Sequence, residues 1–447
     1  MSMTNCSKRA LPWLFGACLA WSALVAQGQT LREAVEHAIR TNPDVLASTS
    51  RRLATDEELN QAQAGFWPRV DLNAGYGREN VDTPEARLLG LSGVALTRKT
   101  TGATLTQMLY DGFGVKSEVA RQQARVDSSA ARVAAAAEDI ALRVVGAYLE
   151  ILRRKESTAF AISNLDSHQR IYEMIKLRSD SGVGRRADLD QADGRLALAK
   201  ASLRAEQSSL KDAEIAFLRL LALPPNALKQ PNVPAASLPA TEAAALEYAI
   251  ENHPALKAVR ADLETAKAQN AVAKSALSPR LDLELGASHG EHTVSGRNED
   301  LAAMLRLRYN FYNGGADEAK IRGTAHLVNE ANEILARTRR QVEEGVSLAY
   351  NGLISARERN VALKQYVESS ASTREAYAKQ FSIAQRSLLD LLNAENEYFN
   401  SRLTYSTGLF TELAAQYRVL SGIGRLLPAL EISLPTEAAY TPTTAVK

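Results

Sequence analysis

The 447-residue sequence contains very little cysteine, and the placement of that cysteine excludes several kinds of site. Both cysteines, Cys6 and Cys18, lie at the N-terminus, so the chain beyond them carries no thiol. A disulfide framework, a cysteine-ligated metal and a catalytic cysteine are therefore excluded from the remainder. Aromatic residues are also scarce, at 6%, and glycine (25) and proline (14) together make up fewer than one residue in ten. This composition favours long helices packed closely side by side.

The sequence has no marked excess of either charge and only one long apolar run. Its 53 basic and 51 acidic residues give no reason to expect a nucleic-acid partner. The apolar run Ala10–Ala26 follows two basic residues and ends in the small-x-small tripeptide Ala26-Gln27-Gly28, which is typical of a secretory signal peptide. We therefore expect export, with residues 1–28 removed. No later run reaches 18 apolar residues, so no transmembrane helix is predicted.

The chain contains two copies of one unit. Residues 34–75 realign on residues 245–286 at a constant offset of 211, and from Tyr110 onwards the copies realign at an offset of 202. Chance could supply a few matching alanines but not the paired prolines Pro43/Pro254 and Pro68/Pro279. We predict a first repeat over 29–222, a Pro-rich linker over 223–241, a second repeat over 242–428 and a C-terminal tail over 429–447.

Each repeat is predicted to contain a β-hairpin and a long helical hairpin. After Pro68 and Pro279 the apolar period changes from helical to two, which indicates hairpins over about 69–110 and 280–312. The helical hairpins follow, over about 111–222 and 316–427. The predicted fold class is mainly α with a small β part: internally duplicated long α-hairpins and four strands per chain.

Three of the four predicted strands alternate apolar and polar side chains, so each of these has one apolar face, whereas Thr101–Tyr110 alternates less well. Leu283 and Leu307 are expected to face lipid, and Glu284 and Arg306 a lumen. A sheet covering a soluble core is the alternative, but helical hairpins this long cannot bury a sheet at their end. In an exported protein this alternation is the signature of an outer-membrane barrel, and four strands cannot close one, so we expect several chains to share it. Aromatic residues near the strand ends suit a membrane–water interface: Phe66, Trp67, Tyr110, Tyr309, Phe311 and Tyr312.

The segment Gln380–Arg402, QFSIAQRSLLDLLNAENEYFNSR, resembles the hairpin-tip motif of the TolC family of outer-membrane channel proteins, in its type I secretion subgroup. The first repeat carries a counterpart that begins at Ser181. The resemblance implies a homotrimer with a 12-strand barrel in the outer membrane and a helical barrel that extends into the periplasm. It also implies two partners, a periplasmic adaptor protein and an inner-membrane transporter. Ala384 stands where the family usually has glycine.

The same resemblance implies two sets of site residues. The turns that would contact the adaptor are Gly182, Val183 and Gly184 in one repeat and Ile383, Ala384 and Gln385 in the other. A periplasmic gate would consist of Asp188, Arg386, Asp390 and Asn393, with Arg386 paired to Asp188 and Asp390 in the constriction. The alternative is structural, because these turns merely join helices and Ser387 with Asp390 reads as a helix N-cap and first turn.

Nothing in the sequence indicates an enzyme, a metal or a cofactor. Only His289 and His292 have ligand-like spacing, and without a third ligand nearby a solvated loop is the better interpretation. We therefore expect a passive exit duct, in type I protein secretion with an ABC transporter. A proton-driven efflux pump is the alternative within the same architecture. A periplasmic coiled-coil scaffold or adhesin without a pore is the alternative from another class.

Overall fold

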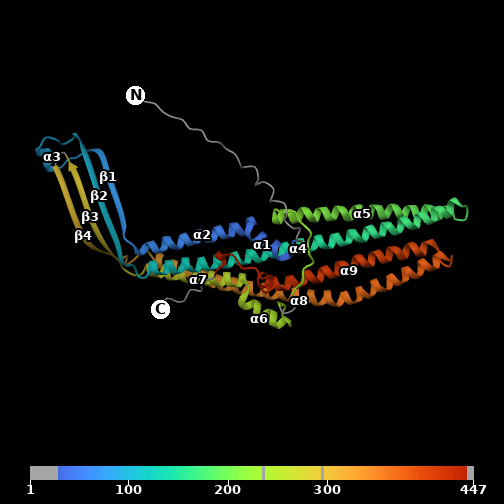
Figure 1. The fold of residues 1–447 in the computed structure, drawn as a ribbon. Helices are drawn as coiled ribbons and strands as arrows, with labels where there is room; N and C mark the ends of the chain where they lie inside the picture. Colours follow the sequence, from blue (N-terminus) through green and yellow to red (C-terminus); the bar gives the residue numbers. More distant parts are fainter. Residues whose placement is uncertain (1–28, 234–236, 293–295, 440–447) are drawn as a thin grey trace, which may run out of the picture.

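The computed structural model describes residues 29–233, 237–292 and 296–439. Two rods of 67 residues each dominate it, α4 (Gly114–Asp180) and α8 (Ala316–Ser382). At 1.5 Å per residue each rod is about 100 Å long. A four-stranded sheet projects beyond one end of the helices, and the two turns that join pairs of long helices lie at the opposite end (Figure 1).

The elements follow one order in both repeats. The first repeat contains α1 (Leu31–Thr41), α2 (Pro43–Gln63), a 3-10 turn (Ala64–Phe66), β1 (Arg69–Asn80), α3 (Pro84–Leu88), β2 (Ala95–Tyr110), α4 and α5 (Arg186–Leu221). The second contains α6 (Glu242–Asn252), α7 (Pro254–Ser275), β3 (Arg280–His292), β4 (Gly296–Arg308), α8 and α9 (Leu388–Gly422). The chain closes with α10 (Leu426–Ala429) and a 3-10 turn (Thr436–Ala438).

The two sequence offsets recur in the element bounds. α6 has the same length as α1 and is displaced from it by the first offset at both ends, and α8 is displaced from α4 by the second offset at both ends. The second helix of each repeat, α2 or α7, begins for the same local reason. The side chains of Asn42 and His253 accept a hydrogen bond from the backbone two residues later, and a proline occupies the first helical position. The predicted fold class is confirmed.

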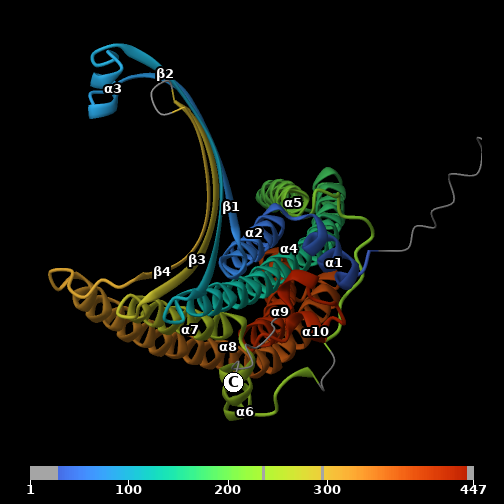
Figure 2. The ribbon, with the colours of Figure 1, turned by 90° about the vertical axis from the view of Figure 1, so that its left-hand side faces the viewer.

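The sheet is antiparallel, in the order β1-β2-β3-β4, so β2 and β3 join the two repeats. It curves as an arc, with α3 at its far end (Figure 2). A bulge between Met108 and Tyr110 interrupts the pairing of β2 with β3 where the sheet meets the helices. Within this chain the outer edges of β1 and β4 have no partner strand among the described residues.

The main core lies where both repeats meet around the middle of α4. Tyr148, fully buried, donates through its hydroxyl to the carbonyl oxygens of Gln29 (2.8 Å) and Lys229 (2.6 Å). Phe217 and Tyr417 are buried in the same cluster. One aromatic residue thus ties the start of the described chain and the linker to the long rod.

Several bounds differ from the sequence-based predictions. β4 ends at Arg308, so the second hairpin is shorter than 280–312, because its pairing with β3 stops at Arg280 and no described strand lies beside residues 309–312. The predicted tail is folded over part of its length: Ile432 is buried, and Ala438 packs against Val133 and Ala134 of α4. The predicted signal peptide lies outside the described residues. Among the described helices, none combines the length and apolarity needed to cross a membrane.

Candidate channel wall and periplasmic gate

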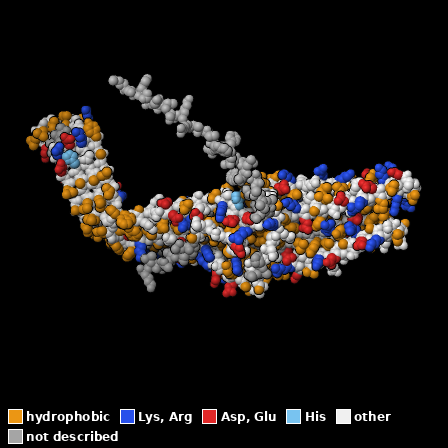
Figure 3. Space-filling view, viewed as in Figure 1, with side chains coloured by type: hydrophobic (Ala, Val, Ile, Leu, Met, Phe, Trp, Pro, Cys, Tyr) orange, Lys and Arg blue, Asp and Glu red, His pale blue; other side chains and the backbone are white. Residues whose placement is uncertain are grey.

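The sheet carries most of its leucine side chains on one face. In the β3–β4 pair Leu283 lies opposite Leu305 and Leu281 opposite Leu307, and in the β1–β2 pair Leu72 lies opposite Ala103. Leu305 and Leu307 are exposed, and Leu72 retains 81% of its accessible surface. Hydrophobic side chains spread over the sheet and its junction with the helices, whereas charged side chains gather on the rods and at the far end of the sheet (Figure 3).

The opposite face carries an ion-pair network at the base of the sheet. Glu284 accepts hydrogen bonds from Arg306 (2.7 Å) and Arg308 (2.8 Å), and Asp282 accepts from Arg280 (2.9 Å). The first repeat has the equivalent pair, Arg69 with Asp71. The predicted alternation in β3 and β4 is therefore present, with Leu283 and Leu307 on one face and Glu284 and Arg306 on the other.

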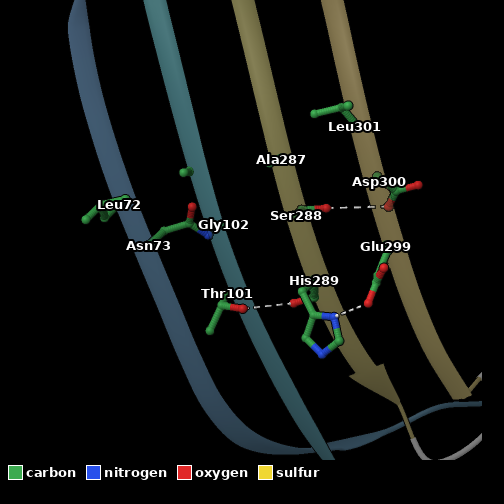
Figure 4. Close-up of a pocket in the computed structure, with 11 residues that line it drawn as sticks. Leu72, Asn73, Thr101, Gly102, Ala287, Ser288, His289, Glu299, Asp300 and Leu301 are labelled. Carbon is green, nitrogen blue, oxygen red and sulfur yellow. Dashed lines mark hydrogen bonds and ion pairs between the residues drawn. The ribbon is translucent and has the colours of Figure 1, made fainter.

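A shallow hollow of about 720 Å³ crosses the strands farther out, where His289 faces Glu299 (Figure 4). The His289 Nδ1 lies 3.3 Å from a Glu299 carboxylate oxygen, and Thr101 donates to the carbonyl oxygen of His289 at 3.4 Å. The lining alternates between the two faces of the strands, which is the shape of a curved sheet and not of an enclosed ligand site. Among the residues that the structure describes, no three His, Cys, Asp or Glu side chains come together as metal ligands.

The predicted interface aromatics lie where the sheet joins the helices, and all are exposed. Trp67, Phe311 and Tyr312 retain 74%, 87% and 79% of their accessible surface, and Phe66, Tyr110 and Tyr309 are also exposed. Tyr110 meets Phe113, and Tyr309 meets Phe311, in edge-on contacts near 6 Å between ring centroids. Exposed aromatic residues at one level suit a boundary between lipid and water.

The two turns at the far ends of the rods share one backbone conformation. The Val183 amide donates to the carbonyl oxygen of Arg178 (3.1 Å), and at the equivalent position of the second repeat the Gln385 amide donates to that of Gln380 (2.9 Å). Gly182 has a φ of 76°, and its counterpart Ala384 has a φ of 60°, a left-handed conformation that costs alanine about 1–2 kcal/mol. Val183 and Ile383 project into solvent at the two turns.

The candidate gate residues lie just beyond these turns. Ser387 caps α9 in a reciprocal capping box with Asp390, as the structural interpretation of that pair predicted. The Arg386 Nε donates to the Gln380 side chain (3.0 Å), and its guanidinium stacks 4.4 Å from the Tyr377 ring centroid and 3.9 Å from Asp390. Among the described residues of this single chain, Arg386 forms no ion pair with Asp188.

Contacts between the two helical hairpins include residues that sequence reasoning missed. The Arg195 guanidinium donates to the Asn393 side-chain oxygen (3.2 Å), and the guanidinium of Arg178 lies 5.0 Å from the Phe381 ring centroid. An apolar cluster that includes Ile175, Leu189 and Leu392 joins both hairpins. Asn393 lies near the tip, and through this hydrogen bond it also connects α9 to α5.

Two buried ionisable side chains on α4 also escaped sequence reasoning. Glu138 is 6% exposed and accepts a hydrogen bond from the Leu427 amide (3.2 Å), and burial raises the pKa of its carboxyl to about 7. His168 is 4% exposed; burial, aided by the charge of Arg195, lowers its pKa. The sequence alone could not identify them, because the burial and pKa of both side chains depend on residues far away in the chain, Leu427 for Glu138 and Arg195 for His168.

The sheet and rods match known proteins along most of the chain. The family model described as outer membrane efflux protein matches residues 34–223 and 245–417. The chain belongs to the outer membrane efflux protein family. The resemblance to TolC-family channels is thereby confirmed, and proteins named TolC are among the relatives. The family comprises channel proteins of the outer membrane, and we place this chain there, with its rods in the periplasm.

Individual relatives are distant but cover nearly the whole chain. Outer membrane efflux protein BepC of Brucella suis is 24% identical, over 94% of this chain and 91% of its own. Alkaline protease secretion protein AprF of Pseudomonas aeruginosa is 23% identical, over 92% and 88%. The crystal structure of the CmeC outer membrane channel of Campylobacter jejuni superposes with a TM-score of 0.78 at 14% identity, over 94% of both chains, which shows a shared fold.

Proposed function

We propose that the protein is a homotrimeric exit duct of a tripartite export system. The observation that carries this proposal is the sheet. Its four strands have one exposed apolar face and two edges without a partner strand among the described residues, and they are attached to rods of about 100 Å. Unpaired strand edges are not tolerated in hydrocarbon, and three chains of four strands would close a barrel of about 12. The rods then continue the conduit through the periplasm.

Type I protein secretion is the system we favour. The tip segment from Gln380 to Arg402 supports it, as does the secretion function in the name of AprF. The turns at Gly182–Gly184 and Ile383–Gln385 are where a periplasmic adaptor would dock, and an ATP-driven transporter would supply the energy. The description of the family and the name of BepC support the second candidate, small-molecule efflux with a proton-driven pump.

The gate belongs to the same proposal. When no transporter is docked, the duct must close at its periplasmic end, and Arg386 of one hairpin would pair there with Asp188 of another. Asp390, repeated three times around the axis, would give the constriction a preference for cations, and Asn393 would contribute no charge.

Single-channel recording in planar bilayers tests the duct. We expect discrete conductance steps from purified trimer, whereas a scaffold or adhesin without a pore would give none. Co-purification of the cross-linked complex from native membranes then separates the two export systems. Recovery of an ATP-driven transporter supports type I secretion, and recovery of a proton-driven pump supports efflux.

A further inference from the structure

The face of the sheet that carries most of the leucines becomes polar toward its outer end, away from the helices. Residues that pair directly across antiparallel strands lie on the same face, so the strand registers divide this face into transverse rows. Two successive rows contain only apolar side chains. They consist of Val70, Leu105, Leu285 and Ala303, and then of Leu72, Ala103, Ala287 and Leu301.

The next two rows outward are mostly polar, and we call them the outer rows. They consist of Ala74, Thr101, His289 and Glu299, and then of Tyr76, Lys99, Glu291 and Arg297. Arg78 follows on the same face, opposite Thr97. All the charged side chains among them are exposed. Basic and acidic groups therefore gather on a face that is apolar closer to the helices.

The outer rows lie at the height where the apolar band of a barrel would end. Tyr110, one of the interface aromatics, pairs with Leu281, and His289 lies eight residues farther along β3. Eight residues of strand span about 27 Å, or about 20 Å in height at a tilt near 40°. Barrels expose an apolar band about 25 Å tall between two girdles of aromatic residues. Tyr76, which is 79% exposed, supplies an aromatic side chain at this second boundary.

The opposite face is uncharged between the two outer rows. The row that lies there consists of Gly75, Thr100, Gly290 and Asn298. Charges that assist conduction would line the lumen, whereas those of the outer rows lie on the leucine face. Their position indicates a ligand outside the barrel.

The spacing of the basic groups is fixed by the sheet. Glu291 lies directly between Lys99 and Arg297 in the register, and the Lys99 Nζ is 3.1 Å from a Glu291 carboxylate oxygen. In the other outer row His289 faces Glu299 in the same manner (Figure 4). The Lys99 side chain remains 56% exposed, and an ammonium has three donors, so contact with one carboxylate leaves donors for a ligand.

We propose that the outer rows bind the phosphorylated headgroup of lipopolysaccharide, the glycolipid of the outer leaflet. Lys99 and Arg297 donate to phosphate oxygens, and Tyr76 packs where the sugars meet the acyl chains. This inference rests on the proposed barrel, which sets the leucine face toward lipid, and adds the class of lipid and the residues that bind it.

Charge and apolar surface together select this occupant. Basic side chains directly above an apolar band match a ligand whose phosphates lie above its acyl chains. A free phosphate ion would match the basic side chains but not the apolar rows beneath them, which contain Leu285 and Leu301.

Native mass spectrometry of the full-length protein in detergent, titrated with diphosphoryl lipid A, tests the site. We expect lipid A to bind the wild-type trimer, and Lys99→Gln with Arg297→Gln to raise the dissociation constant roughly thirtyfold, the effect of two basic residues at an anionic lipid surface. Arg98→Gln with Arg308→Gln is the matched control. It removes the same charge from the opposite face of the sheet and should leave the dissociation constant unchanged.

Excess inorganic phosphate distinguishes the two sources of the same chemistry. It should leave lipid A bound, because phosphate makes no contact with the apolar rows; displacement would show a site for free phosphate and overturn the lipid assignment. Equal weakening in both double variants, or in neither, would also refute the site. A trimer that conducts in bilayers without binding lipid A would refute the site and leave the proposed duct intact. Protein that forms neither trimers nor channels would refute the proposed function itself.

Discussion

Neutralising Glu138 should stabilise the protein at alkaline pH and remove a pH dependence. This carboxyl is buried in the middle of α4, where one oxygen accepts from the Leu427 amide. The other oxygen has no hydrogen-bond partner among the described residues. Glu138→Gln keeps the acceptor and the shape but cannot ionise.

The magnitude follows from the difference between the pKa values of the folded and unfolded states. Burial raises the pKa of Glu138 from 4.5 to about 7. Between these values the unfolded chain releases a proton that the folded chain retains, so the free energy of unfolding falls as pH rises. At 1.36 kcal/mol per pKa unit, the free energy of unfolding is lower by about 3 kcal/mol per chain above pH 7, and this difference vanishes below pH 4.5.

Guanidinium unfolding followed by circular dichroism, from pH 5 to pH 9, measures this difference. We expect Glu138→Gln and wild type to unfold at similar concentrations at pH 5, with the variant more resistant at pH 8. Asp139→Asn is the control, because Asp139 is exposed and forms an ion pair with Arg143 one turn along the same helix. Parallel wild-type and Glu138→Gln curves across the whole range would show that Glu138 ionises freely in the folded protein.

Three further predictions concern the sheet and the tips. Leu283→Arg should cost roughly 2–4 kcal/mol and reduce assembled protein in outer-membrane fractions, whereas Glu284→Leu should be tolerated; the reverse result would invert the two faces. Ala384→Gly should raise the unfolding free energy by about 1 kcal/mol, and Gly182→Ala should lower it, because both positions have positive φ; equal midpoints would contradict the strained turn. Arg386→Glu should raise resting conductance and Asp390→Ala should reduce cation selectivity in bilayers; two variants with wild-type traces would place the gate elsewhere.

Much of the fold could be predicted because its signals are local. The switch to period two after Pro279 fixed which face Leu283 and Glu284 occupy, and the spacing of Ser387 and Asp390 fixed a helix start. The duplication added long-range information, because two matching offsets imply two matching units. These features depend on neighbours within a few residues or on comparison of the chain with itself.

The features that could not be predicted from the sequence depend on contacts between helices or strands that are far apart in the chain. Glu138 is buried only because the chain returns to it 289 residues later, and nothing near it in the sequence signals burial. The contact of Arg195 with Asn393 joins α5 to α9 across 198 residues. β4 ends earlier than predicted for a related reason: residues 309–312 have the alternation of a strand but no neighbouring strand in the described part of the chain.

The contacts of Arg386 bear on how such a gate could switch. In this chain its guanidinium stacks on Tyr377, donates to Gln380 and lies near Asp390, all on its own hairpin. The Arg386 and Asp390 side chains are each 41% exposed, so each contact contributes at most about 1 kcal/mol after solvent screening. Pairing with Asp188 would exchange contacts of similar strength. The two arrangements then differ by at most a few kcal/mol, and differential binding of that size by a docked partner would favour one of them.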